Sequence, residues 1–349
     1  VDLIASVPTR AAEALFWAGR AMERAELVAR SLEVVLDRTD AAFDADVAES
    51  WVGPAVDLVM SVAGVRLADL SEGADRPSIS VASAIDALVR QLGSFLAEVS
   101  SVREFFSVTA GRAFARLAES RSGLGALVEQ GVHDATVDVG RLDIGRVDGR
   151  QLETVLVDLA SVVGLWNESV VRGPAWRFGE IGRRIERALG VVDGVRGAFR
   201  PFADTAPVWL TEPRVAGMDD SDQRIDFARQ RVVEIVLAAN ESLVAYRRRF
   251  RSDVEFEPAM RLVVAERLNP RSAAAAVEAV RTEAANLGWQ QGVEMATGVL
   301  DTLAVASFAD VASTAAALNA VWTGCDEMSR AVVGEYLSAP LDPRMLGGS

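Results

Sequence analysis

The sequence predicts an all-α protein, a bundle of about ten helices built from two pseudo-symmetric halves. Three observations support this fold class. Apolar residues recur at helical spacing through most of the 349 residues, a pattern typical of amphipathic helices. No segment alternates apolar and polar residues clearly enough to predict a sheet. A seven-residue phrase occurs twice, about half the chain apart, and such self-similarity indicates related halves.

The repeated phrase reads GRAMERA at residues 19–25 and GRRIERA at residues 182–188, an offset of 163 residues. Both copies lie in segments with helical periodicity. In each copy the second and sixth residues are arginines, which lie four positions apart and therefore share one helix face. A glutamate precedes the second arginine. The phrase thus predicts two related helices, each with a charged face.

The first half is predicted to contain four helices. Pro8 suits the first turn of the first helix, and Ser101 followed by Glu104 has the spacing of a capping box at the start of the fourth. The residues of the loop at 71–77 are typical of turns. The four predicted helices span about residues 8–38, 51–70, 78–99 and 101–118.

Residues 123–150 are rich in glycine and aspartate, so we expect a loop-rich insertion there, with short helical or extended pieces. It separates the two halves, about residues 8–122 and 151–335. We interpret residues 1–337 as a single helical domain. The last residues, 338–349, contain two prolines and two glycines and are predicted to be a flexible tail.

The second half is predicted to be helical as well. Its longest helix ends in the basic run YRRRFR at residues 246–251, and a turn at Asn269–Ser272 precedes an alanine-rich helix. A further break is expected near Gly298. The predicted helices span about residues 151–171, 175–199, 222–251, 257–268, 273–287 and 288–337, the last being one or two helices.

The composition of the chain excludes several classes of function. The net charge of −14 argues against binding to nucleic acid or to an anionic membrane, because both need a basic surface. All 36 basic residues are arginine, so lysine chemistry is excluded and every cationic contact is a planar guanidinium. No apolar run approaches the roughly 18–20 residues that span a bilayer. We therefore expect a cytoplasmic protein.

No cofactor or metal site is predicted. Cys325 and His133 are the only residues of their types, which rules out zinc sites with several cysteines or histidines. His133 and the aspartates near it do not have the spacing of a calcium loop. A phosphate-binding loop that ends in Gly-Lys is impossible without lysine. Cys325 is expected to be a small buried residue.

The charged phrase has a structural interpretation. The two helices would cross near the pseudo-two-fold axis, and Gly19 and Gly182 would allow their backbones to approach closely. Arg20 and Arg24 would then pair with Glu186 or Glu180 of the other helix, and Arg183 and Arg187 with Glu23 or Glu13. Such a network is specific in geometry but is weak evidence for stability, because desolvation cancels much of the attraction.

The same phrase also has a functional interpretation. Glu13, Trp17, Arg20 and Arg24 fall in one stripe of a helix with about 100° per residue. A mixture of aromatic, acidic and basic side chains suits a polar cleft, where guanidinium groups grip a carboxylate or phosphate in bidentate fashion. The sequence leaves both interpretations open, and they can coexist.

The basic run at residues 246–251 also leaves two alternatives. It is either a solvated helix end, where cations complement the C-terminal dipole, or a group in which Tyr246 and one or two of the arginines face the same cleft as the repeated helices. A nucleic-acid role is disfavoured by the acidic composition.

Four motifs in order resemble the Alpha-E domain family. Residues 10–30 (RAAEALFWAGRAMERAELVAR) resemble its first signature, and residues 173–187, from Gly-Pro-Ala-Trp into the second Glu-Arg, resemble its second. The third is similar to residues 242–251 and the fourth to Asn269–Ser272. The likeness covers about residues 8–335. The chain departs from the family pattern in its first half, where the turn reads Asp75-Arg76-Pro77-Ser78 and an Arg-Glu-Asn motif is missing.

The resemblance implies a bacterial all-helical domain encoded beside, or fused to, a circularly permuted ATP-grasp domain. ATP-grasp enzymes join a carboxylate to an amine through an acyl phosphate. We therefore expect a helical partner of a peptide or amide ligase, which does not bind ATP itself but binds a peptide or amino-acid substrate, or docks the ligase.

In this hypothesis the eight candidate site residues share one cleft. The four arginines Arg20, Arg24, Arg183 and Arg187 would hold substrate carboxylates, and Glu23 and Glu186 would orient the arginines. Tyr246 and Arg247 would close the cleft. Two alternatives remain: a stand-alone enzyme that uses Glu23 and Glu186 as an acid–base or metal-binding pair, and a structural scaffold whose charges are all paired internally.

Overall fold

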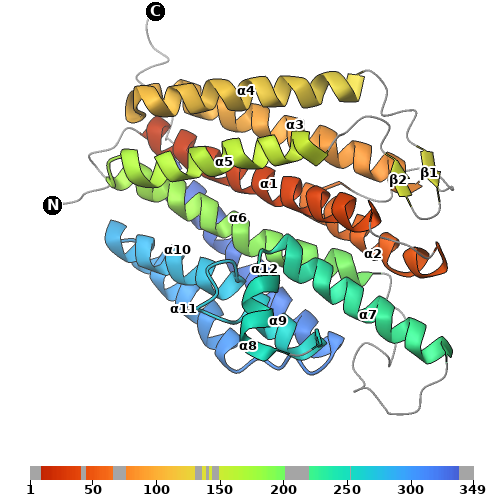
Figure 1. The fold of residues 1–349 in the computed structure, drawn as a ribbon. Helices are drawn as coiled ribbons and strands as arrows, with labels where there is room; N and C mark the ends of the chain where they lie inside the picture. Colours follow the sequence, from red (N-terminus) through yellow and green to blue (C-terminus); the bar gives the residue numbers. More distant parts are fainter. Residues whose placement is uncertain are drawn as a thin grey trace, which may run out of the picture.

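In a computed structural model of the protein, twelve α-helices form a bundle within the residues that are described (Figure 1). These are residues 9–40, 45–65, 76–129, 136–138, 141–143, 149–200, 220–251 and 253–337. The predicted all-α class is confirmed. None of the helices in these ranges is both long and apolar enough to cross a membrane. The predicted tail and His133 lie outside the described residues.

The first half contributes five helices, of which α5 follows the glycine- and aspartate-rich insertion. Helix α1 runs through the first copy of the phrase, and α3 and α4 are joined by a short 3-10 turn at Arg103–Phe105. The bounds are α1 Thr9–Asp40, α2 Ala45–Ala63, α3 Arg76–Ser101, α4 Val108–Glu129 and α5 Gly149–Ser169.

The second half begins with α6, which carries the second copy of the phrase. Its N-terminus is Pro174 after Gly173, a placement that suits proline because the first turn of a helix needs no amide hydrogen. The last helix, α12, ends in a π-helical turn at Val333–Leu337. The bounds are α6 Pro174–Phe199, α7 Asp220–Ala239, α8 Leu243–Phe250, α9 Phe256–Val264, α10 Ala273–Leu287, α11 Gln290–Ala304 and α12 Val311–Val332.

The two halves repeat one succession of packing partners. In the first, α1 packs on α3, α3 on α4, α4 on α5, and α5 returns to α1. In the second, α6 packs on α10, α10 on α11, α11 on α12, and α12 returns to α6. Helices α1 and α6 form the most extensive contact among the described elements, and Figure 1 shows them side by side through the middle of the bundle.

Helix α6 is buried on almost every side, although it carries four charged residues of the repeat and its flank. The buried residues include Glu180, Arg183, Glu186 and Arg187. A helix in such a position is usually apolar all round. Charges that are buried this deeply must be paired, because unpaired charges cost several kcal/mol each. The sequence of α6 therefore requires partners from its neighbours.

One predicted helix is in fact two. The expected single helix at 222–251 is interrupted at Asn240–Ser242, between α7 and α8. Glu241 adopts a left-handed conformation with φ of +49°. The amide of Glu241 bonds the carbonyl of Ala238, and the amide of Ser242 bonds that of Leu237. This is the Schellman pattern that ends helices.

The predicted capping box at Ser101 is wrong. Helix α3 continues to Ser101, whose hydroxyl donates back to the carbonyl of Glu98. Helix α4 begins instead at Val108, where the Ser107 hydroxyl accepts from the amide of Ala110. The cap of α4 therefore lies six residues later than the capping pattern predicted.

The glycines of the insertion and of α11 do not break helices. Helix α4 continues through Gly123 and Gly125 to Glu129, and α11 passes through Gly298. An isolated glycine costs a helix about 1 kcal/mol relative to alanine, which good helix formers around it can offset. Within the insertion, β1 (Thr136–Asp138) and β2 (Arg141–Asp143) form a short antiparallel hairpin.

Candidate functional site

The candidate site is built on the crossing of α1 and α6, where glycines bring the two backbones into contact. A Cβ atom added to Gly19 would lie 2.1 Å from the carbonyl oxygen of Gly179, and one on Gly182 would lie 2.3 Å from that of Phe16. No side chain fits in either place, since a backbone oxygen cannot move aside alone. The crossing therefore needs glycine at these positions, as predicted.

The close crossing brings the second pair of arginines onto Glu23. Arg183 donates from Nε to Glu23 Oε2 (3.1 Å), and Arg187 donates from a terminal nitrogen to the same oxygen (2.7 Å) and from Nε to Oε1 (2.5 Å). Glu23 has no exposed surface, and both arginines are buried. Burial lowers the pKa of Arg187, but the charge and hydrogen bond of Glu23, together with the charges of Glu26 and Glu180, raise it overall.

The first pair of arginines is matched in the same way to Glu186. Arg20 and Arg24 donate from Nε to its two oxygens, at 2.7 Å and 2.5 Å. Arg20 also donates to the hydroxyl of Ser329 on α12 (2.8 Å). Each glutamate thus bridges the two arginines of the opposite helix. Such reciprocity is expected of a contact between related segments.

The two pairs differ in their access to solvent. Arg24 exposes 37% of its side chain, whereas Arg183 and Arg187 each expose 5%. An open pocket of about 360 Å³ lies beside the first pair, between α1, α3 and α6. Its lining residues are Trp17, Arg20, Ala21, Arg24, Gln91, Ser94, Glu98 and Glu186. The first pair therefore lines a pocket, and the second pair belongs to the core.

The pocket has cations on one wall and an acid on another. Arg20 lies over the ring of Trp17, with 5.6 Å between the guanidinium carbon and the ring centroid. Burial raises the pKa of Glu98, on α3, and the nearby charge of Glu13 raises it further. Such a pocket suits a polar ligand whose negative end meets the arginines and whose amide or ammonium end meets Glu98.

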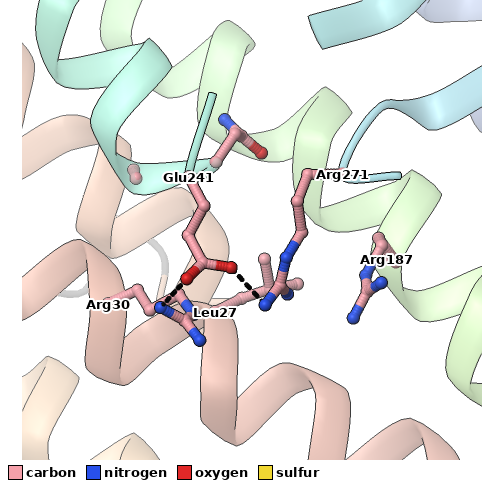
Figure 2. Close-up of a pocket in the computed structure, with 7 residues that line it drawn as sticks. Leu27, Arg30, Arg187, Glu241 and Arg271 are labelled. Carbon is pink, nitrogen blue, oxygen red and sulfur yellow. Dashed lines mark ion pairs between the residues drawn. The ribbon is translucent and has the colours of Figure 1, made fainter. Parts of the chain in front are cut away.

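A second charged cluster adjoins the buried pair, on the side of α10 (Figure 2). Glu26 accepts a hydrogen bond from Arg30 (2.9 Å) and forms an ion pair with Arg271 (2.9 Å), which follows Pro270 in the fourth motif. Glu241 pairs with the same two arginines. Burial alone would raise the pKa of Glu26, but the charges of Arg271, Arg187 and Arg30 lower it to about 2. Glu26 therefore stays ionised in the core.

Glu180 completes the buried network. It accepts from Arg183 (3.4 Å) and from Arg184 (2.5 Å) on its own helix. Burial would raise the pKa of Glu180, and the charges of Arg183 and Arg184 lower it instead. The sequence suggested Glu180 as an alternative partner of Arg20 and Arg24. In the structure Glu186 binds these two arginines, and Glu180 pairs with Arg183 and Arg184 of its own helix.

A profile of helical domains covers nearly all of this architecture. Its description reads "A predicted alpha-helical domain with a conserved ER motif", and it matches residues 7–337. The chain belongs to the Alpha-E family. Its Glu-Arg dipeptides are at residues 23–24, 186–187 and 266–267. The first two supply both glutamates of the reciprocal pairing described above.

Two mycobacterial proteins share part of this Alpha-E sequence. The uncharacterized protein Rv2567 of Mycobacterium tuberculosis and the uncharacterized protein Mb2597 of Mycobacterium bovis are each 29% identical to the chain over 153 residues. The alignment covers 44% of this chain and 15% of either relative. No solved structure matches the chain.

Six of the eight candidate residues of the Alpha-E chain are brought together, and two are not. Tyr246, a residue of α8, is buried, and its hydroxyl donates to the carbonyl of Asp253 (3.3 Å) and accepts from the amide of Glu255 (3.0 Å). Arg247 is 60% exposed and pairs with Glu234 (3.6 Å). Neither lines the pocket beside Arg24. The expectation that they close this cleft is therefore wrong.

The sequence also missed residues that belong to the charged cluster: Glu26, Arg30, Glu241 and Arg271. Glu26, Arg30 and Arg271 lie within two of the family-like motifs, and that was the only signal for them. Nothing in their spacing indicates that they meet, because they come from α1, the α7–α8 turn and the turn before α10.

Glu23 and Glu186 do not converge on one open point. Each is buried and engaged by two arginines of the opposite helix. Within the described residues, no three His, Cys, Asp or Glu side chains are placed to hold a metal ion. Cys325 is buried as expected, and burial raises the pKa of its thiol to about 12.

Asp193, on α6 near the pocket arginines, gives the protein a testable pH dependence. Its burial, together with the charge of Glu186, raises the pKa to about 6 from the ordinary value of 3.8. The folded state therefore holds this proton at pH values where the unfolded chain has released it. The contribution of Asp193 to stability is therefore full below about pH 4 and is lost as the pH rises toward and through 6.

Asp193→Asn is expected to abolish this loss. At pH 4 its free energy of unfolding should be close to that of the wild type, and at pH 8 it should exceed it by about 3 kcal/mol. Urea denaturation across this range measures the difference, with exposed Asp301→Asn on α11 as the control. A difference between Asp193→Asn and wild type that does not change with pH would contradict the assignment.

Proposed function

We propose that this Alpha-E chain is the helical partner of an ATP-grasp peptide or amide ligase. In this role it binds a peptide or amino acid that carries a carboxylate, or docks the ligase, and it leaves ATP activation to the ATP-grasp domain. The ligase is either a separate chain or fused to this one. The ligase context rests on the family resemblance, and the substrate class rests on the pocket beside Arg20 and Arg24.

One observation carries the substrate class. Glu186 engages the Nε atoms of both Arg20 and Arg24, and the terminal nitrogens of Arg24 have no hydrogen-bonding partner among the described residues. Two guanidiniums thus share the hydrogen bonds of one carboxylate at the edge of an open pocket. A further carboxylate from a ligand would complete the pairing, and guanidinium forks bind carboxylates in bidentate geometry.

The remaining lining supports a peptide or amino acid. The pocket volume of about 360 Å³ lies within the ~300–1,000 Å³ of small-molecule sites. The raised pKa of Glu98 shows that its ionised form is disfavoured in the pocket, and a ligand ammonium or amide N–H beside it would stabilise that form. Trp17 offers an apolar face that is 37% exposed. A ligand with a carboxylate at one end and an amino group at the other can contact the arginines with the first and Glu98 with the second.

The buried pair favours a structural role for the other half of the signature. Glu23, Arg183 and Arg187 are enclosed and satisfied by one another. We therefore assign the scaffold role to this trio and ligand binding to the pair at the pocket.

Arg24→Gln is expected to weaken binding of Glu- and Asp-containing dipeptides at least tenfold, because a hydrogen bond to a charged group contributes ~1.5–3 kcal/mol. Titration calorimetry on the folded chain measures this effect. Arg112→Gln, an exposed arginine of α4, is the matched control and should bind as the wild type does.

The ligase context needs a separate measurement. The chain should co-purify with the ATP-grasp protein encoded beside it, and the complex should form an amide from dipeptide and amine with ATP consumption. The Arg20→Gln/Arg24→Gln double variant should reduce ligation at least tenfold. The proposal fails if this variant ligates and assembles as the wild type does.

A further inference from the structure

The α7–α8 turn has a glutamate where helix ends of this kind favour glycine. Glu241 occupies the left-handed position of the Schellman pattern with φ of +49°, and glycine or asparagine is the usual residue there. Backbone strain that persists at one residue indicates a function for its side chain. The position of the Glu241 carboxylate therefore indicates what this side chain does.

The carboxylate of Glu241 lies between two arginines from distant segments. Figure 2 shows it directed toward Arg30 of α1 and Arg271 of the turn before α10, with ion pairs to both. The guanidinium of Arg187 lines the same pocket. This arrangement has the geometry with which guanidinium groups hold an oxyanion.

The cluster needs this anion for its charge balance. Ion pairs connect it into one network of five arginines and four glutamates, Arg30, Arg183, Arg184, Arg187, Arg271, Glu23, Glu26, Glu180 and Glu241. The network has a charge of +1 with Glu241 and +2 without it. Removing Glu241 would leave Arg30 and Arg271 to share Glu26 alone.

Glu241 is the member of the network that can leave. Its side chain is 37% exposed, whereas that of Glu26 is 6% exposed. The free volume beside it is about 10 Å³, which is room for about one water molecule. The site is therefore filled by the protein's own carboxylate, which can move into solvent without unfolding the helices on either side.

We infer that Arg30 and Arg271 form a binding site for the oxyanion group of a ligand, and that Glu241 occupies it as a displaceable internal carboxylate. The ligand group is a carboxylate or a phosphate, which share this chemistry. The site uses neither Arg20 nor Arg24, so it is separate from the pocket of the proposed function and does not depend on it.

The test compares anion binding by wild type, Glu241→Gly and Glu241→Gly/Arg271→Gln. Glycine suits the left-handed turn and vacates the site. Titration calorimetry with glutarate and, separately, with inorganic phosphate is run against sodium chloride of equal ionic strength. Glu241→Gly is expected to bind one of these probes with a Kd at least tenfold lower than that of the wild type. The double variant should lose this gain.

The two titrations identify the chemical class of the oxyanion. A lower Kd for glutarate indicates a carboxylate ligand, and a lower Kd for phosphate indicates a phosphoryl group. Glu241→Gln should shift the Kd in the same direction and carries the test if the glycine variant does not fold. Arg112→Gln, an exposed arginine of α4, should leave the gain intact in the Glu241→Gly background. Equal binding by wild type and both Glu241 variants would overturn the inference and leave Glu241 a purely structural residue.

Discussion

Glu23→Gln is expected to lower the free energy of unfolding by about 3–5 kcal/mol, because it removes one partner of a buried ion network. Arg183 and Arg187 would keep their charges inside the core and lose the carboxylate that neutralises them. Glutamine is close to glutamate in size, so packing changes little and the loss reports charge. Urea denaturation followed by far-ultraviolet circular dichroism measures it.

Glu186→Gln is the matched control, since it is the corresponding residue of the other copy of the phrase. Its arginines, Arg20 and Arg24, reach solvent at the pocket, so water can replace part of the lost interaction. We expect this variant to lose less than half as much stability. Equal losses in the two variants would contradict the division into a buried pair and a pocket pair.

Gly19→Ala is expected to cost about 3 kcal/mol or more, at the upper end of the range for overpacked cores. The new Cβ would lie 2.1 Å from the carbonyl oxygen of Gly179, so α1 and α6 would have to separate. Their separation would lengthen every ion pair across the crossing. The variant should therefore lose stability far beyond the effect of one methyl group.

Gly111→Ala tests whether the effect comes from the crossing and not from glycine in a helix. Gly111 lies in α4 with nothing near the place of a Cβ, and alanine there should add about 0.5–1 kcal/mol. Thermal and urea denaturation of both variants give the comparison. A loss of less than 1 kcal/mol for Gly19→Ala would mean that the helices do not approach as closely as described.

The repeated phrase supplied the main sequence evidence for the crossing of α1 and α6 and for the charged residues of the site. One of its two interpretations contained a close crossing at glycines and the pairing of arginines with glutamates of the opposite helix. These predictions succeeded because residue type and helical spacing are local properties. A glycine next to a charged stripe indicates close approach wherever the partner helix lies, and a buried arginine must find a carboxylate.

The sequence was least informative at the α7–α8 turn. No glycine or proline marks it, so the apolar periodicity ran on as one helix. The turn is held by Asn269, which donates to the hydroxyl of Ser242 (2.9 Å) and to the carbonyl of Leu262. The contact with Ser242 joins residues 27 positions apart, and no local pattern contains it. For the same reason Glu241 was not predicted to meet Arg30 and Arg271.

By itself, the sequence determined the helices, the charged faces of α1 and α6, and the need for reciprocal pairing. Only the tertiary structure decided which arginines face solvent and which are enclosed. The two copies of the phrase are nearly alike, and the difference lies in what packs over them. The turn before α10, with Arg271, and the α7–α8 turn cover the second pair, while α3 leaves a pocket beside the first. Burial depends on segments far apart in the chain, and so does the role of each arginine.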